Sequence, residues 1–499
     1  MEIIPLFGIF ATILDSEIRK YTMNMKRFAG WTCALAAALF LSCSDDDVKG
    51  SLAFDTPAVF FADGDTAPVT VHFTASNLNS FSVSSTPTGW DGIVLDPVAC
   101  TVTVTPPDSF DDDEAKTGSI VLSGKGGGGA TGSASLFVGV VEQKEFSERA
   151  NSYIVNQKET NYLLDVEHRS DGATLATVSV ELIWQNPSSL IQYLTLKNGK
   201  ASFYVGADSD DDTKIKSGNA VIGAFDAAGK LLWSWHIWVA DYDPSAAGNQ
   251  KIFNGYTMMD RNLGARASGN ASTDDILASY GLYYQWGRKD PFIGPSTYNF
   301  ASGSAATLYN GSNTSITATP AASSSSNGTM EYAQLNPYIF ITGVEDSDYD
   351  WLWSDHSATL WTAPGSAKSL YDPCPAGWRV APAAAFEGLT PDSESLGWKN
   401  TKYSVTLVKE GVSSLFMGAG RRTYLDGKFQ NVYVAGYDPK GTRADEAQPW
   451  IGLYWTADAQ TSDNLSSALY FRYGSSEEVQ NAYALRRSTG LPVRCVKSE

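Results

Sequence analysis

The sequence has few residues of the types that carry catalysis or bind metals. Its 499 residues include five cysteines and four histidines, and the histidines (His72, His168, His236 and His356) lie far apart in the chain. Zinc sites need several histidines or cysteines at close spacing. The GxSxG, HExxH, Walker and dinucleotide-binding patterns of common enzyme classes are also absent. The sequence therefore favours a protein that is not an enzyme and that needs no cofactor.

Basic residues are in the minority. The 36 lysines and arginines stand against 55 acidic residues, which gives a net charge of −19. Nucleic acids and anionic membrane surfaces repel such a chain, so the sequence excludes them as partners. The many acidic residues supply accidental carboxylate pairs, as a glycosidase would need, and an enzyme of unknown reaction is kept as the third option behind two binding functions.

Two acidic clusters, at residues 111–114 and 208–212, supply the oxygen ligands that calcium prefers. Neither cluster has the glycine and glutamate spacing of an EF-hand loop. We therefore interpret both clusters as solvated turns, with calcium as the alternative, and the metal content stays unknown at this stage.

Aromatic residues and glycine are abundant: 24 Tyr, 22 Phe, 14 Trp and 44 Gly. Aromatic residues favour strands. Segments of alternating polarity separated by turns predict a β-sandwich over residues 51–145 and a second β-sandwich module over 150–245. In the last strand of the second module we expect Trp233 and Trp235 to face the core and His236 to have a structural role. The remaining residues, 249–499, form a third unit.

The segment 25–42 has the features of an export signal. Two basic residues precede an apolar run that is too short to span a bilayer, and small Ser42 precedes Cys43. The run LFLSC resembles a bacterial lipobox, which implies a lipidated Cys43 at the start of the mature chain. Residues 1–24 do not fit ahead of such a signal, and we expect them to reflect a misassigned start site.

An acidic tether, residues 43–50, follows the expected lipidation site. Its Ser44, Asp45, Asp46 and Asp47 resemble the signal that sends Bacteroidetes lipoproteins across the outer membrane. We therefore expect an outer-membrane protein that is lipid-anchored and exposed at the cell surface, with a solvated tether as the alternative interpretation of the acidic run.

The order of strands around Trp90 in the first module resembles a BACON domain, an Ig-like module associated with glycan-targeting surface proteins. A spacer role is the favoured interpretation. We keep the acidic turn near residue 111 as part of this module.

The third unit carries the most specific signal. Its blocks MDRNLGA, YGLYYQWGRKDPF, YDPCPAGWRV, GLYWTA and GLPVRCV occur in the order found in the Fibrobacter-type major paralogous domain. The resemblance implies a C-type-lectin-like α+β fold. The preceding WSWHIWV strand, together with these blocks, also resembles fimbrillin-like lipoproteins of Bacteroidetes, including proteins proposed as pilus tips.

Cys374 and Cys495 both lie in this third unit, and the resemblance implies a structural disulfide between them. Cys100, in the apolar strand pattern VACTVTV of the first module, is then left as a buried free thiol. The sulfatase-activating relatives of this fold need a reactive cysteine pair, and no second pair remains here. The resemblance therefore supports a binding protein.

Exposed aromatics are the candidate ligand site. Trp351 and Trp353, next to Asp355, combine flat apolar rings with hydrogen-bond acceptors, as carbohydrate binding requires. Both tryptophans and the aromatics at 283–286 are open to the alternative of a core position. Residues 300–328 are rich in Ala, Ser, Thr and Asn and predict an exposed loop insertion.

The expected fold is thus mainly β, with two β-sandwich modules followed by an α+β, C-type-lectin-like domain. The expected function is adhesion through a fimbrial tip-type lipoprotein that recognises a glycan or a protein, with pilus subunits as further candidate partners. The alternative is an accessory glycan-capture protein of a polysaccharide-utilisation system. The ligand, the oligomeric state and the true start codon are not determined by the sequence.

Overall fold

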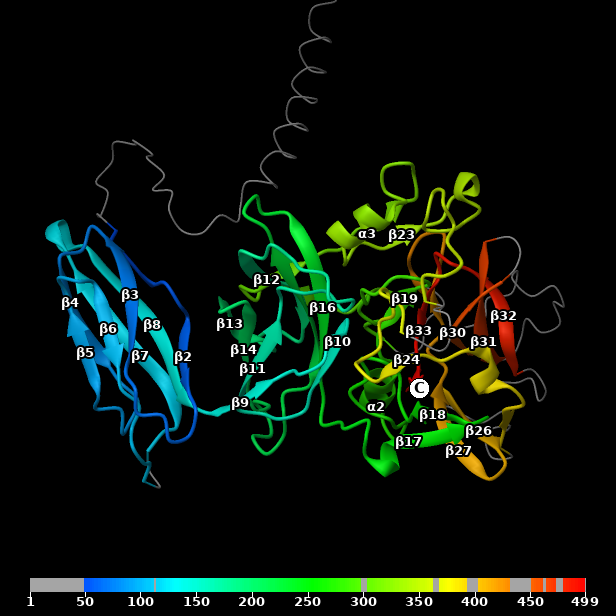
Figure 1. The fold of residues 1–499 in the computed structure, drawn as a ribbon, viewed down its shortest axis with the longest axis horizontal. Helices are drawn as coiled ribbons and strands as arrows, with labels where there is room; N and C mark the ends of the chain where they lie inside the picture. The colour runs from blue at the N-terminus through cyan, green and yellow to red at the C-terminus, as the bar shows by residue number, and fades with distance from the viewer. Residues whose placement is uncertain are drawn as a thin grey trace, which may run out of the picture.

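The computed structural model describes residues 49–111, 114–297, 303–361, 368–392, 403–430, 450–460, 464–472 and 479–498. The predicted start site, export signal, lipidated Cys43 and acidic address at Ser44 to Asp47 lie outside these residues. Within the described ranges, no helix is long and apolar enough to cross a membrane. The fold is mainly β, as the sequence predicted, and its three units lie in a row (Figure 1).

The first module is a sandwich of two four-stranded sheets, ordered β1-β3-β6-β5 and β2-β8-β7-β4. Alternate residues of each strand enter the core, such as Ile120 and Leu122 of β7. Trp90 is buried there and donates its indole N–H to the carbonyl of Ala115 at 2.8 Å. The strands are β1 (Ser51–Phe54), β2 (Ala58–Phe61), β3 (Val69–Ser76), β4 (Ser80–Ser85), β5 (Ile93–Asp96), β6 (Thr101–Val104), β7 (Thr117–Lys125) and β8 (Thr131–Val140).

The second module pairs a sheet ordered β13-β14-β11-β9 with a sheet ordered β10-β16-β15-β12-β20-β21. Trp233 and Trp235 are buried in its core, as predicted. Its strands are β9 (Glu142–Glu145), β10 (Ser152–Val155), β11 (Thr160–Asp165), β12 (Ser179–Asn186), β13 (Gln192–Lys197), β14 (Lys200–Val205), β15 (Gly218–Phe225) and β16 (Leu231–Val239).

Two boundaries of the second module differ from the sequence prediction. Residues 142–145 were assigned to the first module, but they form β9, which pairs in parallel with β11. Part of the predicted exposed loop insertion also belongs here, because β20 (Leu308–Tyr309) and β21 (Ser315–Ile316) extend the sheet beyond β12. Pairing with β20 gives hydrogen-bond partners to backbone N–H and C=O groups that would otherwise be unpaired at the edge of β12.

The C-terminal unit combines short helices with several small sheets. Its helix α2 (Thr273–Tyr280) begins with a capping box between Ser272 and Asp275. The helix ends before Gly281, whose φ of 73° suits glycine. The remaining elements are α3 (Met330–Leu335) and the strands β17 (Gln250–Phe253), β18 (Tyr256–Met259), β19 (Tyr283–Gln285), β22 (Ala321–Ala322), β23 (Ile341–Thr342), β24 (Trp378–Val380), β25 (Thr390–Pro391), β26 (Ser404–Lys409), β27 (Val412–Met417), β28 (Arg421–Arg422), β29 (Phe429–Gln430), β30 (Ile451–Ala459), β31 (Leu465–Arg472), β32 (Gln480–Arg486), β33 (Gly490–Pro492) and β34 (Cys495–Lys497).

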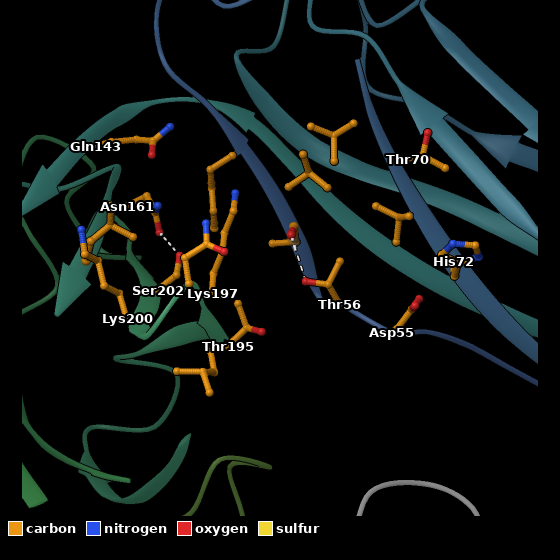
Figure 2. Close-up of a pocket in the computed structure, with 18 residues that line it drawn as sticks. Asp55, Thr56, Thr70, His72, Gln143, Asn161, Thr195, Lys197, Lys200 and Ser202 are labelled. Atoms are coloured by element: carbon orange, nitrogen blue, oxygen red, sulfur yellow. Dashed lines mark hydrogen bonds between the residues drawn. The ribbon is translucent and has the colours of Figure 1, made fainter. Parts of the chain in front are cut away.

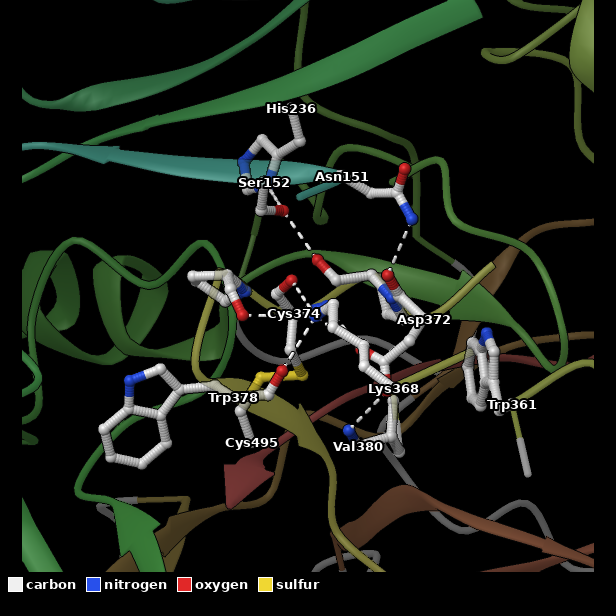
Figure 3. Close-up of a disulfide and its surroundings, with 12 residues drawn as sticks. Asn151, Ser152, His236, Trp361, Lys368, Asp372, Cys374, Trp378, Val380 and Cys495 are labelled. Atoms are coloured by element: carbon white, nitrogen blue, oxygen red, sulfur yellow. Dashed lines mark hydrogen bonds and ion pairs between the residues drawn. A yellow bond between two sulfur atoms is a disulfide. The ribbon is translucent and has the colours of Figure 1, made fainter. Parts of the chain in front are cut away.

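A disulfide joins Cys374 to Cys495 inside this unit, as the resemblance implied (Figure 3). It links the segment before β24 to β34, and those two strands also pair through Val380 and Cys495. Cys100 is free, as predicted, but it is half-buried and lies in the turn before β6, so its predicted buried position in a strand is wrong.

The second module and the C-terminal unit share one apolar core, although the sequence analysis treated them as separate domains. Asn151 donates its side-chain amide to the carbonyls of Leu370 and Asp372, and Ser152 donates to the carbonyl of Pro373 (Figure 3). Trp238 donates its indole N–H to the carbonyl of Ala265. Buried hydrogen bonds of this kind hold the two units together.

Candidate functional site

The two tryptophans of the predicted ligand site have different surroundings. Trp351 has 0% of its surface exposed, and its indole N–H donates to the carbonyl of Trp286 at 2.8 Å. The prediction of Trp351 as a binding residue is therefore wrong, because its ring lies inside the apolar core. Trp353 is half-buried and Asp355 is exposed. Their binding role stays a prediction.

The neighbouring aromatics of the third unit build its core. Tyr283, Tyr284 and Trp286 are fully buried. Tyr283 donates its hydroxyl to the carbonyl of Ala419 at 2.6 Å, and Trp286 donates its indole N–H to the carbonyl of Thr456 at 3.0 Å. These rings therefore offer no face to a ligand.

His236 is fully buried between the second module and the C-terminal unit. Its Nδ1 lies 2.8 Å from the Ser152 hydroxyl and its Nε2 lies 2.9 Å from Asn219 Oδ1. Burial lowers the pKa of His236 to about 3, so the ring is neutral at physiological pH. This environment agrees with the structural role that the sequence indicated.

A serine, a lysine and an aspartate meet in the same interior region. Lys289 Nζ lies 2.6 Å from Asp290 Oδ1 and 2.9 Å from the carbonyl oxygen of Ser234, and the Ser234 hydroxyl donates to Asp290 at 2.6 Å. All three residues are buried. A substrate therefore has no access to this cluster, whose hydrogen bonds tie β16 to the C-terminal unit.

The acidic clusters considered for calcium make local contacts. Asp211 pairs with Lys214 at 2.6 Å and accepts a hydrogen bond from the Thr213 backbone, while Asp208 accepts one from the Asp210 backbone. Residues 112 and 113 lie outside the described ranges. Within those ranges, no group of three or more His, Cys, Asp or Glu residues is arranged to hold a metal ion.

A cleft of about 470 Å³ lies between the first module and the second (Figure 2). The first module contributes residues of β2 and β3 and of the segment before β2, and the second contributes residues of β9, β11, β13 and β14 and of the turn between β13 and β14. The labelled lining residues are Asp55, Thr56, Thr70, His72, Gln143, Asn161, Thr195, Lys197, Lys200 and Ser202.

The period of two in each strand explains why these side chains face the cleft. In β11, Tyr162 and Leu164 enter the core of the second module, so Asn161 and Leu163 lie on the other face of the sheet. Ser202 has the same position on β14, next to inward-facing Phe203. Asn161 and Ser202 nevertheless have only 2% and 3% of their surface exposed. The first module lies against this face of the sheet.

Four aromatic rings hold the first two modules together beside the cleft. Phe137 and Tyr193 stack with their centroids 4.3 Å apart, and Phe60 and Tyr204 stack at 5.7 Å. We call Phe60, Phe137, Tyr193 and Tyr204 the junction cluster. Aromatic pairs of this kind each contribute about 0.5–1.5 kcal/mol beyond their buried area. The junction cluster therefore favours one arrangement of the two modules.

The polar groups of the cleft are incompletely paired. Ser202 donates its hydroxyl to Asn161 Oδ1 at 2.9 Å. Among the described residues, none accepts a hydrogen bond from Asn161 Nδ2. Lys200 pairs with Glu145 at 2.6 Å at the edge of the cleft. The site thus combines an unpaired amide donor with hydroxyls, charged side chains, an aromatic ring and aliphatic side chains, which is a set that can bind a ligand.

Sequence reasoning did not identify this site. Its signal was present as polar residues at alternate positions of otherwise apolar strands, namely Asn161 in TNYLLD and Ser202 in KASFYV. Tyr193 and Tyr204 lie on the same outer face, and two aromatic residues on an outer face are a further signal of a contact surface that the sequence analysis did not use. Which module covers that face is not visible in the sequence.

The comparisons with known proteins are uninformative about function. No family model matches the sequence, and no curated protein matches it. Solved structures that match include three titin Ig domains (18% identity, 38% of this chain and 64% of that chain, TM-score 0.14) and Drosophila N-cadherin EC1-4 (12% identity, 38% and 50%, TM-score 0.16). Protocadherin gamma B2 matches at 12% identity over 39% of this chain and 52% of that chain, with a TM-score of 0.15.

The chain thus spans about half to two thirds of the length of these structures. TM-scores this low carry no argument about relationship or activity. The described β-sandwich folds are themselves consistent with an adhesion or binding role.

Proposed function

We propose that this protein is a cell-surface lipoprotein that binds a glycan or a surface protein and catalyses no reaction. The observation that supports the proposal most directly is the cleft between the first two modules, where Asn161 Nδ2 has no acceptor among the described residues. This donor is therefore free to form a hydrogen bond with a ligand. The cleft thus replaces buried Trp351 as the candidate binding site.

The lining of the cleft suits a neutral glycan. Phe60 and Leu163 supply an apolar surface for the C–H face of a sugar ring. Asn161, Ser202 and Thr195 supply an amide and hydroxyls for sugar hydroxyl groups. Cationic Lys197 and acidic Asp55 both lie at the cleft, so neither sign of charge dominates it.

The expected lipid at Cys43 and the acidic address at Ser44 to Asp47 support display outside the outer membrane. The row of three units, which begins after the expected anchor, supports a protein that extends outward from the membrane (Figure 1). The resemblance of the C-terminal unit to fimbrillin-like lipoproteins with a C-type-lectin-like domain favours a fimbrial tip-type adhesin. The alternative is an accessory glycan-capture protein of a polysaccharide-utilisation system.

A glycan array with the purified full chain tests the proposal. We expect binding to a defined glycan, and we expect Asn161→Leu to reduce it at least about tenfold, because a buried hydrogen-bond donor is lost. Asn327→Leu is the matched control, since Asn327 lies in a turn of the C-terminal unit. Equal binding by both variants would place the ligand outside the cleft. Protein arrays, and pull-down assays with pilus subunits, test whether the ligand is a protein.

Two further observations separate the competing functions. Incubation of the bound oligosaccharide with the full chain should leave its length unchanged, and shortened products would favour the glycosidase option. Pilin genes beside this gene would favour the adhesin, whereas transporters and glycoside hydrolases would favour glycan capture.

A further inference from the structure

A second cavity, of about 370 Å³, lies between the second module and the C-terminal unit. Its walls expose apolar and polar groups in about equal parts and come from β12, from residues 291–293 and from the segment that carries β20 and β21. The wall residues used here are Trp184, Phe292, Leu308, Ile316 and Tyr338. Arg422 is the one charged residue among those that line the cavity.

Arg422 is buried without a counter-ion. It has 5% of its surface exposed, and its Nε donates to the carbonyl of Gly427 at 2.5 Å. Its guanidinium carbon lies 4.3 Å from the ring centroid of Phe340. In the described part of the chain, its two terminal nitrogens have no hydrogen-bond acceptor and no carboxylate pairs with it.

Two other buried arginines of the C-terminal unit have acceptors for their terminal nitrogens. Arg288 donates from its terminal nitrogens to Gln285 Oε1 and to backbone carbonyls. Arg494 donates to Asn262 Oδ1 at 3.0 Å and to the carbonyl of Leu415 at 2.9 Å. Arg422 differs from them because neither of its terminal nitrogens has an acceptor among the described residues.

The local backbone is built around the Arg422 side chain. Arg422 pairs with Phe429 of β29 and with Gly490 of β33. A Cβ at Gly490 would lie 2.9 Å from the Arg422 Cβ and 3.0 Å from the Phe340 ring. The absence of a side chain at Gly490 therefore leaves room for the arginine. Burial and the nearby Arg288 lower the pKa of Arg422 to about 9, which still leaves it cationic near neutral pH.

We propose that this cavity binds a small monocarboxylate with an apolar body, and that Arg422 holds its carboxylate through the two free terminal nitrogens. A guanidinium matches a carboxylate with two parallel hydrogen bonds. The apolar part of the wall, which includes Trp184, Phe292 and Leu308, fits the rest of such a ligand. One arginine supplies only one compensating charge, and the net charge of −19 opposes multiply charged anions. This site is independent of the cleft between the first two modules.

The test uses the purified full chain and 4-methylpentanoate as the probe, with the neutral amide 4-methylpentanamide for comparison. Saturation-transfer NMR titrations should show saturable binding of the acid and none of the amide. Arg422→Met should weaken binding of the acid at least about tenfold, because the charged half of the pair is lost. Arg421→Met is the matched control, since Arg421 is the neighbouring residue of β28 and donates to Gln430.

A second variant separates loss of the site from misfolding caused by the change at Arg422. Thr317→Trp changes an exposed residue of the cavity wall and leaves Arg422 intact, so it should abolish binding by filling the cavity. Melting of Arg422→Met should occur at or above the native temperature, because an uncompensated buried charge is removed. Absence of saturable binding by the native chain, equal binding of acid and amide, or unchanged binding by either Arg422→Met or Thr317→Trp would overturn the proposal.

Discussion

At the residue scale, Trp351 and Trp353 are two positions apart and yet face different environments. Trp351→Ala should lower the free energy of unfolding by about 3–5 kcal/mol, because it empties a large core position. Trp353→Ala should lower it much less, since its ring is half-buried. Urea denaturation of both variants beside Trp378→Ala measures the difference. Equal destabilisation by Trp351→Ala and Trp353→Ala would show that Trp353 is also a core residue.

His236 should make the protein less stable as the pH falls. Burial lowers the folded-state pKa to about 3, whereas an unfolded histidine has a pKa of about 6.5. Below about pH 6.5 the unfolded chain binds a proton that the folded chain does not, so stability is fully present above that pH and falls toward about pH 3. His236→Gln should remove this part of the slope of unfolding free energy against pH. An unchanged slope in acid denaturation would show that His236 is not its source.

The contribution of His356 to stability should change with pH in the opposite direction to that of His236. Its Nδ1 lies 3.0 Å from Asp350 Oδ2, and this hydrogen bond raises the pKa of His356. The stability that the contact contributes is present below about pH 6.5 and is lost as the pH rises through the folded-state pKa. His356→Asn should therefore flatten the slope of stability on the alkaline side of about pH 6.5 and leave the His236 slope in acid intact. Urea denaturation at pH values on both sides of about pH 6.5 measures this slope. His356→Asn thus serves as the control for His236→Gln.

At the element scale, the disulfide closes a loop with a sequence separation of 121 residues. In the chain-entropy model, the double variant Cys374→Ala with Cys495→Ala should lose about 4–5 kcal/mol of unfolding free energy. Peptide mapping without reductant should recover one bridged pair and a free Cys100 thiol. A peptide that bridges Cys100 to either partner would contradict the assignment.

Strand edges connect the second and third units. The β20–β21 hairpin continues the sheet of the second module, and Asn313 Oδ1 accepts hydrogen bonds from Gln185 and from the Ser189 backbone. A segment that looks like a polar insertion in the sequence is therefore an element of a neighbouring module. The same hairpin contributes a wall of the Arg422 cavity, so the site depends on both units.

At the scale of the whole molecule, the junction cluster determines whether the cleft exists. The double variant Tyr193→Ala with Tyr204→Ala should raise the radius of gyration in small-angle scattering, because the first module loses its stacked contacts. It should also weaken glycan binding at the cleft. Tyr483→Ala is the control, since Tyr483 is exposed on the C-terminal unit. An unchanged radius would mean that other contacts hold the modules.

Anchoring is the second prediction at this scale. Cys43→Ala should stop lipidation and release the protein or leave an uncleaved precursor, because acyl chains hold it to the membrane. Replacement of Asp45, Asp46 and Asp47 by alanine should retain the protein on the periplasmic side. Protease treatment of intact cells measures both, and unchanged surface digestion of the triple variant would rule out the address interpretation.

The sequence by itself determined the features that depend on near neighbours in the chain. Alternating polarity predicted the strands of the first two modules, and it correctly assigned Trp233 and Trp235 to a core. The resemblance of the C-terminal blocks implied the bridge between Cys374 and Cys495. These features follow from strand periodicity and from block order, both of which are written in the chain.

Only the tertiary structure decided which faces are covered. Trp351 has the same local pattern as an exposed ring, but it is buried in the apolar core and its indole N–H donates to the carbonyl of Trp286. Asn161 and Arg422 are ordinary polar residues in the sequence. Asn161 faces a cleft because the first module packs over β11, and Arg422 lies at a cavity because β28 meets the β20–β21 hairpin. The burial of a residue depends on its contacts with segments that are distant in the sequence, so no local sequence pattern determines it.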